Sequence, residues 1–176
     1  MNCSLCACEA SPTLRISGLD LCEDCCQADP SEALAQRGLP VEFDDRLGYF
    51  SAGAGISHAD PEFHISCRPE LFVHKLEKLV HAEVQVGDPA FDDRVFIRTS
   101  KPGLAAHVLA DEGVQSALLA LLSGLMVDDL PNHVSFETGS LRIQTRPQGG
   151  LPPELFQQLK LETAALLVGM DRRLRG

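Results

Sequence analysis

Two pairs of cysteines constrain this chain more than any other feature. Each pair has the form C-x2-C, one at Cys3 and Cys6 and the other at Cys22 and Cys25, with fifteen residues between the pairs. This spacing is typical of four-cysteine zinc sites, because each pair curls around one side of an ion and two pairs complete a tetrahedron of Zn–S bonds of about 2.3 Å. We expect these four cysteines to bind one structural Zn²⁺, since four thiolates leave no coordination position for a substrate.

The other cysteines bear on redox state and on the choice of ligands. A disulfide framework requires an oxidising compartment, yet the first residues carry neither the basic nor the apolar stretch of a secretory signal. The seven cysteines are also an odd number. We therefore expect a cytoplasmic chain with reduced thiols. Cys8 and Cys26 adjoin the two pairs, and the sequence leaves open whether either replaces a ligand.

The residues around the second pair predict a hairpin followed by a helix. Thr13–Ser17 and Leu19–Leu21 alternate like two short strands around Gly18, and the second pair opens a helical stretch that Gly38 ends. A cysteine turn, a hairpin and a cysteine turn at a helix start resemble a treble-clef zinc finger, over about residues 1–38. A zinc ribbon would place its ligands similarly and remains the alternative.

Charge disfavours two classes of partner. The formal net charge is −10 at pH 7. The first 38 residues are acidic as well, with two basic residues, Arg15 and Arg37, and six acidic ones, Glu9, Asp20, Glu23, Asp24, Asp29 and Glu32. Nucleic acids and anionic membrane surfaces repel such a chain, and no apolar run reaches the eighteen or so residues of a membrane helix. We expect the partner to be another protein, with no nucleic acid and no membrane.

Composition divides the rest of the chain into a connection and a second module. Glycine and proline interrupt residues 39–61, which we predict to be a connecting segment with one candidate strand at Val41–Phe50 and a loop at Ser51–Gly55. Residues 62–176 predict a mixed α+β domain. The predicted strands are Phe63–Cys67, Ala82–Val86, Arg94–Arg98, Val134–Glu137 and Leu141–Gln144, and the predicted helices follow Pro69 and span Pro102–Ala110, Val114–Met126 and Pro152–Arg173.

One turn in this module supports a resemblance. The run Val86-Gly87-Asp88-Pro89-Ala90-Phe91-Asp92-Asp93-Arg94-Val95-Phe96-Ile97-Arg98, with the later hairpin at residues 134–143, is similar to an uncharacterised bacterial domain family. In that family a G-D-x-x-F-D turn joins two strands ahead of a helix and a hairpin. The resemblance covers about residues 62–146. It implies a fold but no activity and no catalytic residue.

The same turn supplies the alternative to a binding function. Asp88, Asp92 and Asp93 could form the carboxylate site of a hydrolase-like enzyme. A structural turn is favoured, because Asp before Pro favours a turn and Asp92 can accept backbone N–H groups as the next strand begins. The six histidines are scattered, and none lies in an H-E-x-x-H motif.

Together these patterns predict an α+β protein made of a small four-cysteine zinc finger and a domain with antiparallel hairpins and a long C-terminal helix. We expect it to act as a non-enzymatic protein-binding or assembly module, with zinc in a structural role.

Overall fold

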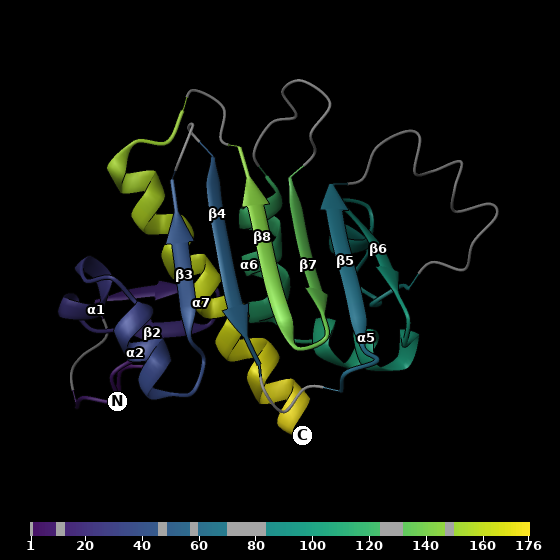
Figure 1. The fold of residues 1–176 in the computed structure, drawn as a ribbon, viewed down its shortest axis with the longest axis horizontal. Helices are drawn as coiled ribbons and strands as arrows, with labels where there is room; N and C mark the ends of the chain where they lie inside the picture. Colours follow the sequence, from purple (N-terminus) through teal and green to yellow (C-terminus); the bar gives the residue numbers. More distant parts are fainter. Residues whose placement is uncertain are drawn as a thin grey trace.

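A six-stranded antiparallel sheet forms the centre of the molecule, in the order β3-β4-β8-β7-β5-β6 (Figure 1). The computed structural model describes residues 2–9, 13–45, 49–56, 60–69, 84–123, 132–146 and 150–176. The strands of the sheet are β3 (Val41–Asp44), β4 (Phe50–Gly55), β5 (His64–Pro69), β6 (Val95–Thr99), β7 (His133–Glu137) and β8 (Ser140–Thr145). The predicted α+β fold is confirmed, as is the hairpin of β7 and β8.

Three helices cover one face of this sheet, and the opposite face is turned toward the viewer in Figure 1. They are α5 (Pro102–Leu109), α6 (Glu112–Leu122) and α7 (Pro153–Arg175), the last being the predicted C-terminal helix. Phe136, Leu141 and Ile143 point into the core beneath the helices, where each is about 1% exposed or less. The residues that alternate with them point to the uncovered face. None of the helices in the described part of the chain is long and apolar enough to cross a membrane.

The N-terminal residues form a small module beside the sheet (Figure 1). It contains the predicted hairpin of β1 (Leu14–Ile16) and β2 (Leu19–Leu21), followed by the short helices α1 (Glu23–Gln27) and α2 (Ser31–Gln36).

The predicted end of the module's second helix is also confirmed. Gly38 has φ +77°, in the left-handed region that glycine adopts at low cost. Its N–H donates to Ala35 O (2.9 Å), and the N–H of Leu39 donates to Leu34 O (2.9 Å). This pair of bonds is the Schellman motif, and the side chains of Leu34 and Leu39 are both buried, as is frequent in this motif.

The prediction of a loop at Ser51–Gly55 is wrong, because these residues belong to β4. Ala52 and Ala54 continue the inward face that Phe50 begins, while Gly53 and Gly55 lie on the uncovered face. Small side chains concealed this alternation in the sequence. Residues 39–61 therefore supply β3 and β4 to the sheet, whereas the division between residues 1–38 and 62–176 stays a prediction.

The approach to β6 differs from the prediction as well. Val84–Val86 are not part of a strand, and the turn after them contains a one-turn helix, α4 (Pro89–Asp92). The reason is that Asp92 accepts the N–H groups of Val86 (3.0 Å) and Gly87 (3.1 Å), so these donors bond to a side chain and not to a neighbouring strand. The helix predicted after Pro69 falls in residues 70–83, outside the described residues.

Candidate metal centre

The four predicted cysteines converge in the N-terminal module. The sulfur atoms of Cys3, Cys6, Cys22 and Cys25 all lie within 4.8 Å of one another. Cys6 Sγ and Cys22 Sγ are 3.7 Å apart, and two sulfurs bound tetrahedrally at about 2.3 Å from one ion would be about 3.8 Å apart. The cysteines are free thiols. This group can therefore hold a metal ion of the size expected.

A tight N-terminal turn positions the first pair. The N–H of Ala7 donates to Cys3 O (3.1 Å), and the N–H of Cys3 donates to Cys8 O (3.0 Å). The chain therefore folds back on itself between Cys3 and Cys8. Ala7 adopts φ 58°, in the left-handed region that a non-glycine residue enters only at such turns. The turn brings the sulfurs of Cys3 and Cys6 within 4.8 Å of each other.

The hairpin and the first helix position the second pair. Cys22 follows β2 directly and is the N-cap residue of α1, and Cys25 lies within that helix. The sulfurs of both cysteines lie within 4.8 Å of those of Cys3 and Cys6, so this pair faces the N-terminal turn. One pair thus comes from a turn and the other from the start of a helix.

The electrostatic environment differs among the four cysteines and favours the thiolate, the form that binds metals, at Cys3. Burial raises the pKa of Cys3, but backbone N–H groups of Cys6, Cys22 and Leu5 outweigh it and lower that pKa to about 6. One of these donors is visible as the N–H of Cys22, 3.5 Å from Cys3 Sγ. Burial and hydrogen bonding to the neighbouring thiols raise the pKa of Cys25. Several thiolates in one small space repel each other, and a divalent cation removes that repulsion.

Cys8 and Cys26 lie at the margin of this group. The thiol of Cys6 donates to Cys8 Sγ at 3.2 Å, and this contact raises the pKa of Cys8 to about 12. Burial raises the pKa of Cys26. Neither residue belongs to the set whose sulfurs all lie within 4.8 Å. Cys67 is remote from them, buried in the core under the sheet.

Polar side chains of α7 hold the module against the sheet domain. Gln157 Nε2 donates to Ala28 O (2.8 Å), and Lys160 Nζ lies 2.5 Å from Asp29 Oδ2. Nearer the hairpin turn, Ser17 Oγ donates to Glu162 Oε2 (2.5 Å). The module with the four-cysteine group is therefore attached to a helix that also packs on the sheet.

Glu162 is a residue whose role the sequence did not reveal. It lies in the middle of α7 and is 7% exposed. Burial raises its pKa, although the hydrogen bond from Ser17 acts in the opposite direction. The one available signal was a glutamate in an otherwise uncharged stretch of helix, Leu161 to Met170.

Asp111 is the second buried carboxyl of the same region. It caps α6 by accepting the N–H groups of Gly113 and Val114 at 3.0 and 3.2 Å, and Arg172 Nη2 lies 2.5 Å from its other oxygen. Burial raises its pKa, but the Val114 N–H and the arginine outweigh that effect and lower it. Asp111 is therefore a structural anchor between α6 and α7.

The carboxylates of the predicted alternative site are bonded to backbone. Asp88 Oδ1 accepts from the N–H groups of Ala90 (2.9 Å) and Phe91 (3.4 Å). Asp92 accepts from the N–H groups of Val86 and Gly87. Asp93 is exposed and follows the same short helix. The structure brings the first two aspartates into one turn, where they satisfy N–H donors.

The histidines are dispersed in the described residues as well. His133 Nε2 lies 3.0 Å from Ser66 Oγ, and burial lowers its pKa, as does the nearby Arg68. His58, His74 and His81 lie outside the described residues.

No family model, no curated protein and no solved structure matches this chain. No family is identified. The resemblance of residues 62–146 to a bacterial domain family therefore stays a resemblance, and the candidate metal centre rests on its own geometry.

Proposed function

We propose that Cys3, Cys6, Cys22 and Cys25 bind one structural Zn²⁺ ion, and that the chain is a non-enzymatic protein-binding or assembly module. The observation that carries the proposal is the convergence of the four sulfurs within 4.8 Å of one another. Four thiolates suit zinc because it accepts soft sulfur ligands in a tetrahedron without a redox change. When bound, the ion supplies folding free energy and no reaction step.

The order of the elements favours a treble-clef-like finger over a ribbon. The first ligand pair lies in a turn, β1 and β2 follow, and the second pair opens α1. A ribbon would take its second pair from another hairpin turn. This order of elements in the described residues up to Gly38 supports the treble-clef-like finger.

Two features support a binding role over catalysis. A complete set of four thiolates offers a substrate no open position on the metal. In the turn that would carry the hydrolase alternative, Asp88 and Asp92 accept backbone N–H groups, which stabilises their carboxylates in place. No observation among the described residues favours the hydrolase over the binding module.

The test is metal content, with a matched pair of variants. Protein purified without chelator should contain one zinc per chain by elemental analysis, and Cys22→Ser should lose it while Cys26→Ser keeps it. Cobalt substitution should give the absorption of tetrahedral thiolate-bound Co²⁺ in wild type and in Cys26→Ser. Iron in place of zinc, or equal metal content in the two variants, would contradict the proposal.

The binding role needs a separate test. The metal-loaded protein should capture a partner that binds again when both proteins are purified, and Cys22→Ser should lose it if the finger contributes to the contact. A chain that turns over a substrate, with loss of activity in Asp88→Asn or Asp92→Asn, would favour the hydrolase instead.

A further inference from the structure

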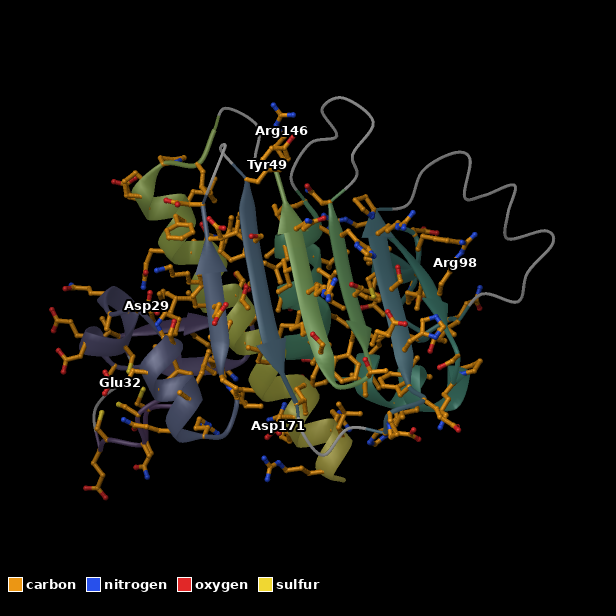
Figure 2. All side chains as sticks on the ribbon, in the orientation of Figure 1. Asp29, Glu32, Tyr49, Arg98, Arg146 and Asp171 are labelled. Atoms are coloured by element: carbon orange, nitrogen blue, oxygen red, sulfur yellow. The ribbon has the colours of Figure 1, made fainter. Side chains whose placement is uncertain are left out.

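A depression lies on the uncovered face of the sheet where the N-terminal module meets it. Its volume is about 650 Å³. Glu32 and Ala35 of α2 line one side, and β3 and β4 supply Glu42, Gly53 and Gly55 to the floor. Figure 2 shows Glu32 on the module's side of the sheet. Both regions of the chain therefore contribute to this surface.

A second depression continues the first toward the turn between β7 and β8. Its volume is about 540 Å³, and it shares Pro40 and Gly55 with the first. Its lining also includes Thr138 and Gly139 of that turn. The two depressions form one groove, which we call the α2–β4 groove.

The fold of the chain itself does not require the two glycines of β4. Glycine weakens a strand and marks a bulge, a sharp bend or the close approach of a ligand or another backbone. β4 pairs with β8 without a bulge from Phe50 to Gly55, and neither Gly53 nor Gly55 has a positive φ. A Cβ atom added to either glycine would meet no atom of the described residues within 4 Å. The reason that remains is close approach by a molecule from outside the chain.

The groove is acidic on the module's side. Glu32 and Glu42 are both exposed, and neither has an ion-pair partner among the described residues. In the same region, Asp29 is paired with Lys160. The whole chain has a formal net charge of −10, which attracts cationic partners over a distance. Charge complementarity therefore selects a positively charged occupant.

Arg142 limits how much positive charge the groove accepts. The strand pairing places it opposite Gly53 and two strands from Glu42, which is about 10 Å at the usual strand spacing. A cation beside Glu42 is attracted, whereas a second cation over Arg142 is repelled. A segment with a single basic residue therefore fits better than a polybasic run. Arginine fits better than lysine, because its planar fork of N–H donors can bond to two carboxylates at once.

We propose that the α2–β4 groove binds a segment of a partner protein that carries a single arginine, with its guanidinium between Glu32 and Glu42. This assignment, which rests on the protein-binding role proposed above, gives that role a partner of defined chemistry. The aliphatic part of the arginine side chain lies against Ala35 and the glycine floor, and its charged end reaches the carboxylates. Because Glu32 belongs to the module, the groove is complete only when the module is folded.

The test is an NMR titration of the metal-loaded, isotope-labelled full chain with the blocked tripeptide acetyl-Ala-Arg-Ala-amide. So small a probe should bind with a Kd on the order of 1 mM, and the backbone signals of Glu42, Gly53 and Gly55 should shift. Gly53→Val fills the floor with a side chain that suits a strand and meets open space. Gly53→Val and Glu42→Gln should each weaken binding by about tenfold or more. Glu154→Gln, an equal change in charge at the exposed start of α7, should leave binding unchanged.

The lysine counterpart, acetyl-Ala-Lys-Ala-amide, should bind more weakly, and equal binding of the two peptides overturns the assignment of arginine. The absence of any shift at about 20 mM peptide, roughly twentyfold above the expected Kd, overturns the proposal. Shifts that both groove variants leave unchanged do so as well. Equal weakening by Glu154→Gln would show general attraction to an acidic chain and would also overturn it. Zinc content and circular dichroism show whether each variant is folded.

The docking groove and the proposed binding role fail separately. A purified partner that binds the Gly53→Val variant as tightly as wild type removes the groove from the contact and leaves the binding role intact. A partner that loses affinity for both Gly53→Val and Glu42→Gln, and keeps it for Glu154→Gln, supports both.

Discussion

The N-terminal module and the sheet domain differ in how much buried apolar surface stabilises them. The module's elements are three to six residues long, and its buried apolar side chains are few, Leu21 and Leu34 among them. The sheet domain has six strands under three helices, with Phe50, Phe63 and Phe136 fully enclosed. Burial of apolar surface is the main source of stability in the larger region. A region as small as the N-terminal module commonly needs a disulfide or a metal in addition, so we expect its four thiols and a metal ion to supply that stability.

The contact between the two regions contains both apolar and polar side chains. Apolar side chains of the module join the core that continues under the sheet. Specific positions are fixed by polar groups of α7, where Lys160 pairs with Asp29 and its ammonium lies 4.6 Å from the centre of the Phe156 ring. The module's attachment is therefore partly independent of its metal, and the following changes test how far the two regions depend on each other.

Removing the metal should have the largest effect. Structural zinc contributes on the order of 10 kcal/mol or more to a small finger, so chelation should abolish hydrogen-exchange protection in β1, β2 and α1. The strands β7 and β8 should stay protected, because their hydrogen bonds lie in the centre of the sheet. Exchange measured by mass spectrometry, with zinc added back as the control, compares the two. Simultaneous loss of protection in both regions would show one cooperative unit and remove the predicted boundary after residue 38.

Truncation of a side chain in the sheet core should destabilise the sheet and leave the zinc content of the N-terminal module unchanged. Phe136 is 1% exposed, and its ring lies 5.7 Å from that of Phe63. Phe136→Ala should cost about 3–5 kcal/mol of unfolding free energy, measured by urea denaturation, while zinc content stays at one per chain. Ser135→Ala, on the neighbouring residue that faces away from the core, is the matched control and should change stability by less than about 0.5 kcal/mol. Loss of zinc in Phe136→Ala would mean that the module cannot fold without an intact sheet.

A change at the junction should have an intermediate effect. Ser17→Ala removes the hydroxyl that donates to Glu162 and leaves a buried carboxyl without that donor. We expect a loss of about 1–3 kcal/mol and faster hydrogen exchange in the β1–β2 hairpin. Arg15→Ala, in the same hairpin but with a side chain that is 74% exposed, should be nearly neutral. Equal effects of the two substitutions would assign the loss to the hairpin itself and not to the junction.

Local patterns made the module more predictable than the sheet. The group of four cysteines, the hairpin around Gly18 and the helix end at Gly38 each depend on residues close together in sequence. The order β3-β4-β8-β7-β5-β6 and the placement of β4 depend on pairings between distant segments. The contact of Ser17 with Glu162 joins residues 145 positions apart, and no local pattern in the sequence records it. Asp88 and Asp92 were predictable as turn residues, because their partners lie within six residues of them.

The smallest predicted effect is the pH dependence of the junction. Burial raises the pKa of Glu162, so the folded protein retains this proton to a higher pH than the unfolded chain does. Its contribution to stability is therefore complete below the ordinary glutamate pKa of about 4.3 and is lost as pH rises through the raised value.

Glu162→Gln keeps an oxygen that accepts from Ser17 and carries no charge, so its stability relative to wild type should increase with pH, by about 1 kcal/mol or less. Asp111→Asn is the control, because the pKa of Asp111 is lowered and its contribution to stability changes only at pH values below the ordinary aspartate range, so its difference from wild type should stay constant from about pH 5.5 to 8. Urea unfolding of the metal-loaded proteins between pH 5.5 and 8 avoids acid release of the metal. A difference between Glu162→Gln and wild type that does not change over this window would show that Glu162 has the same charge throughout it, and that the junction depends on the hydrogen bond alone.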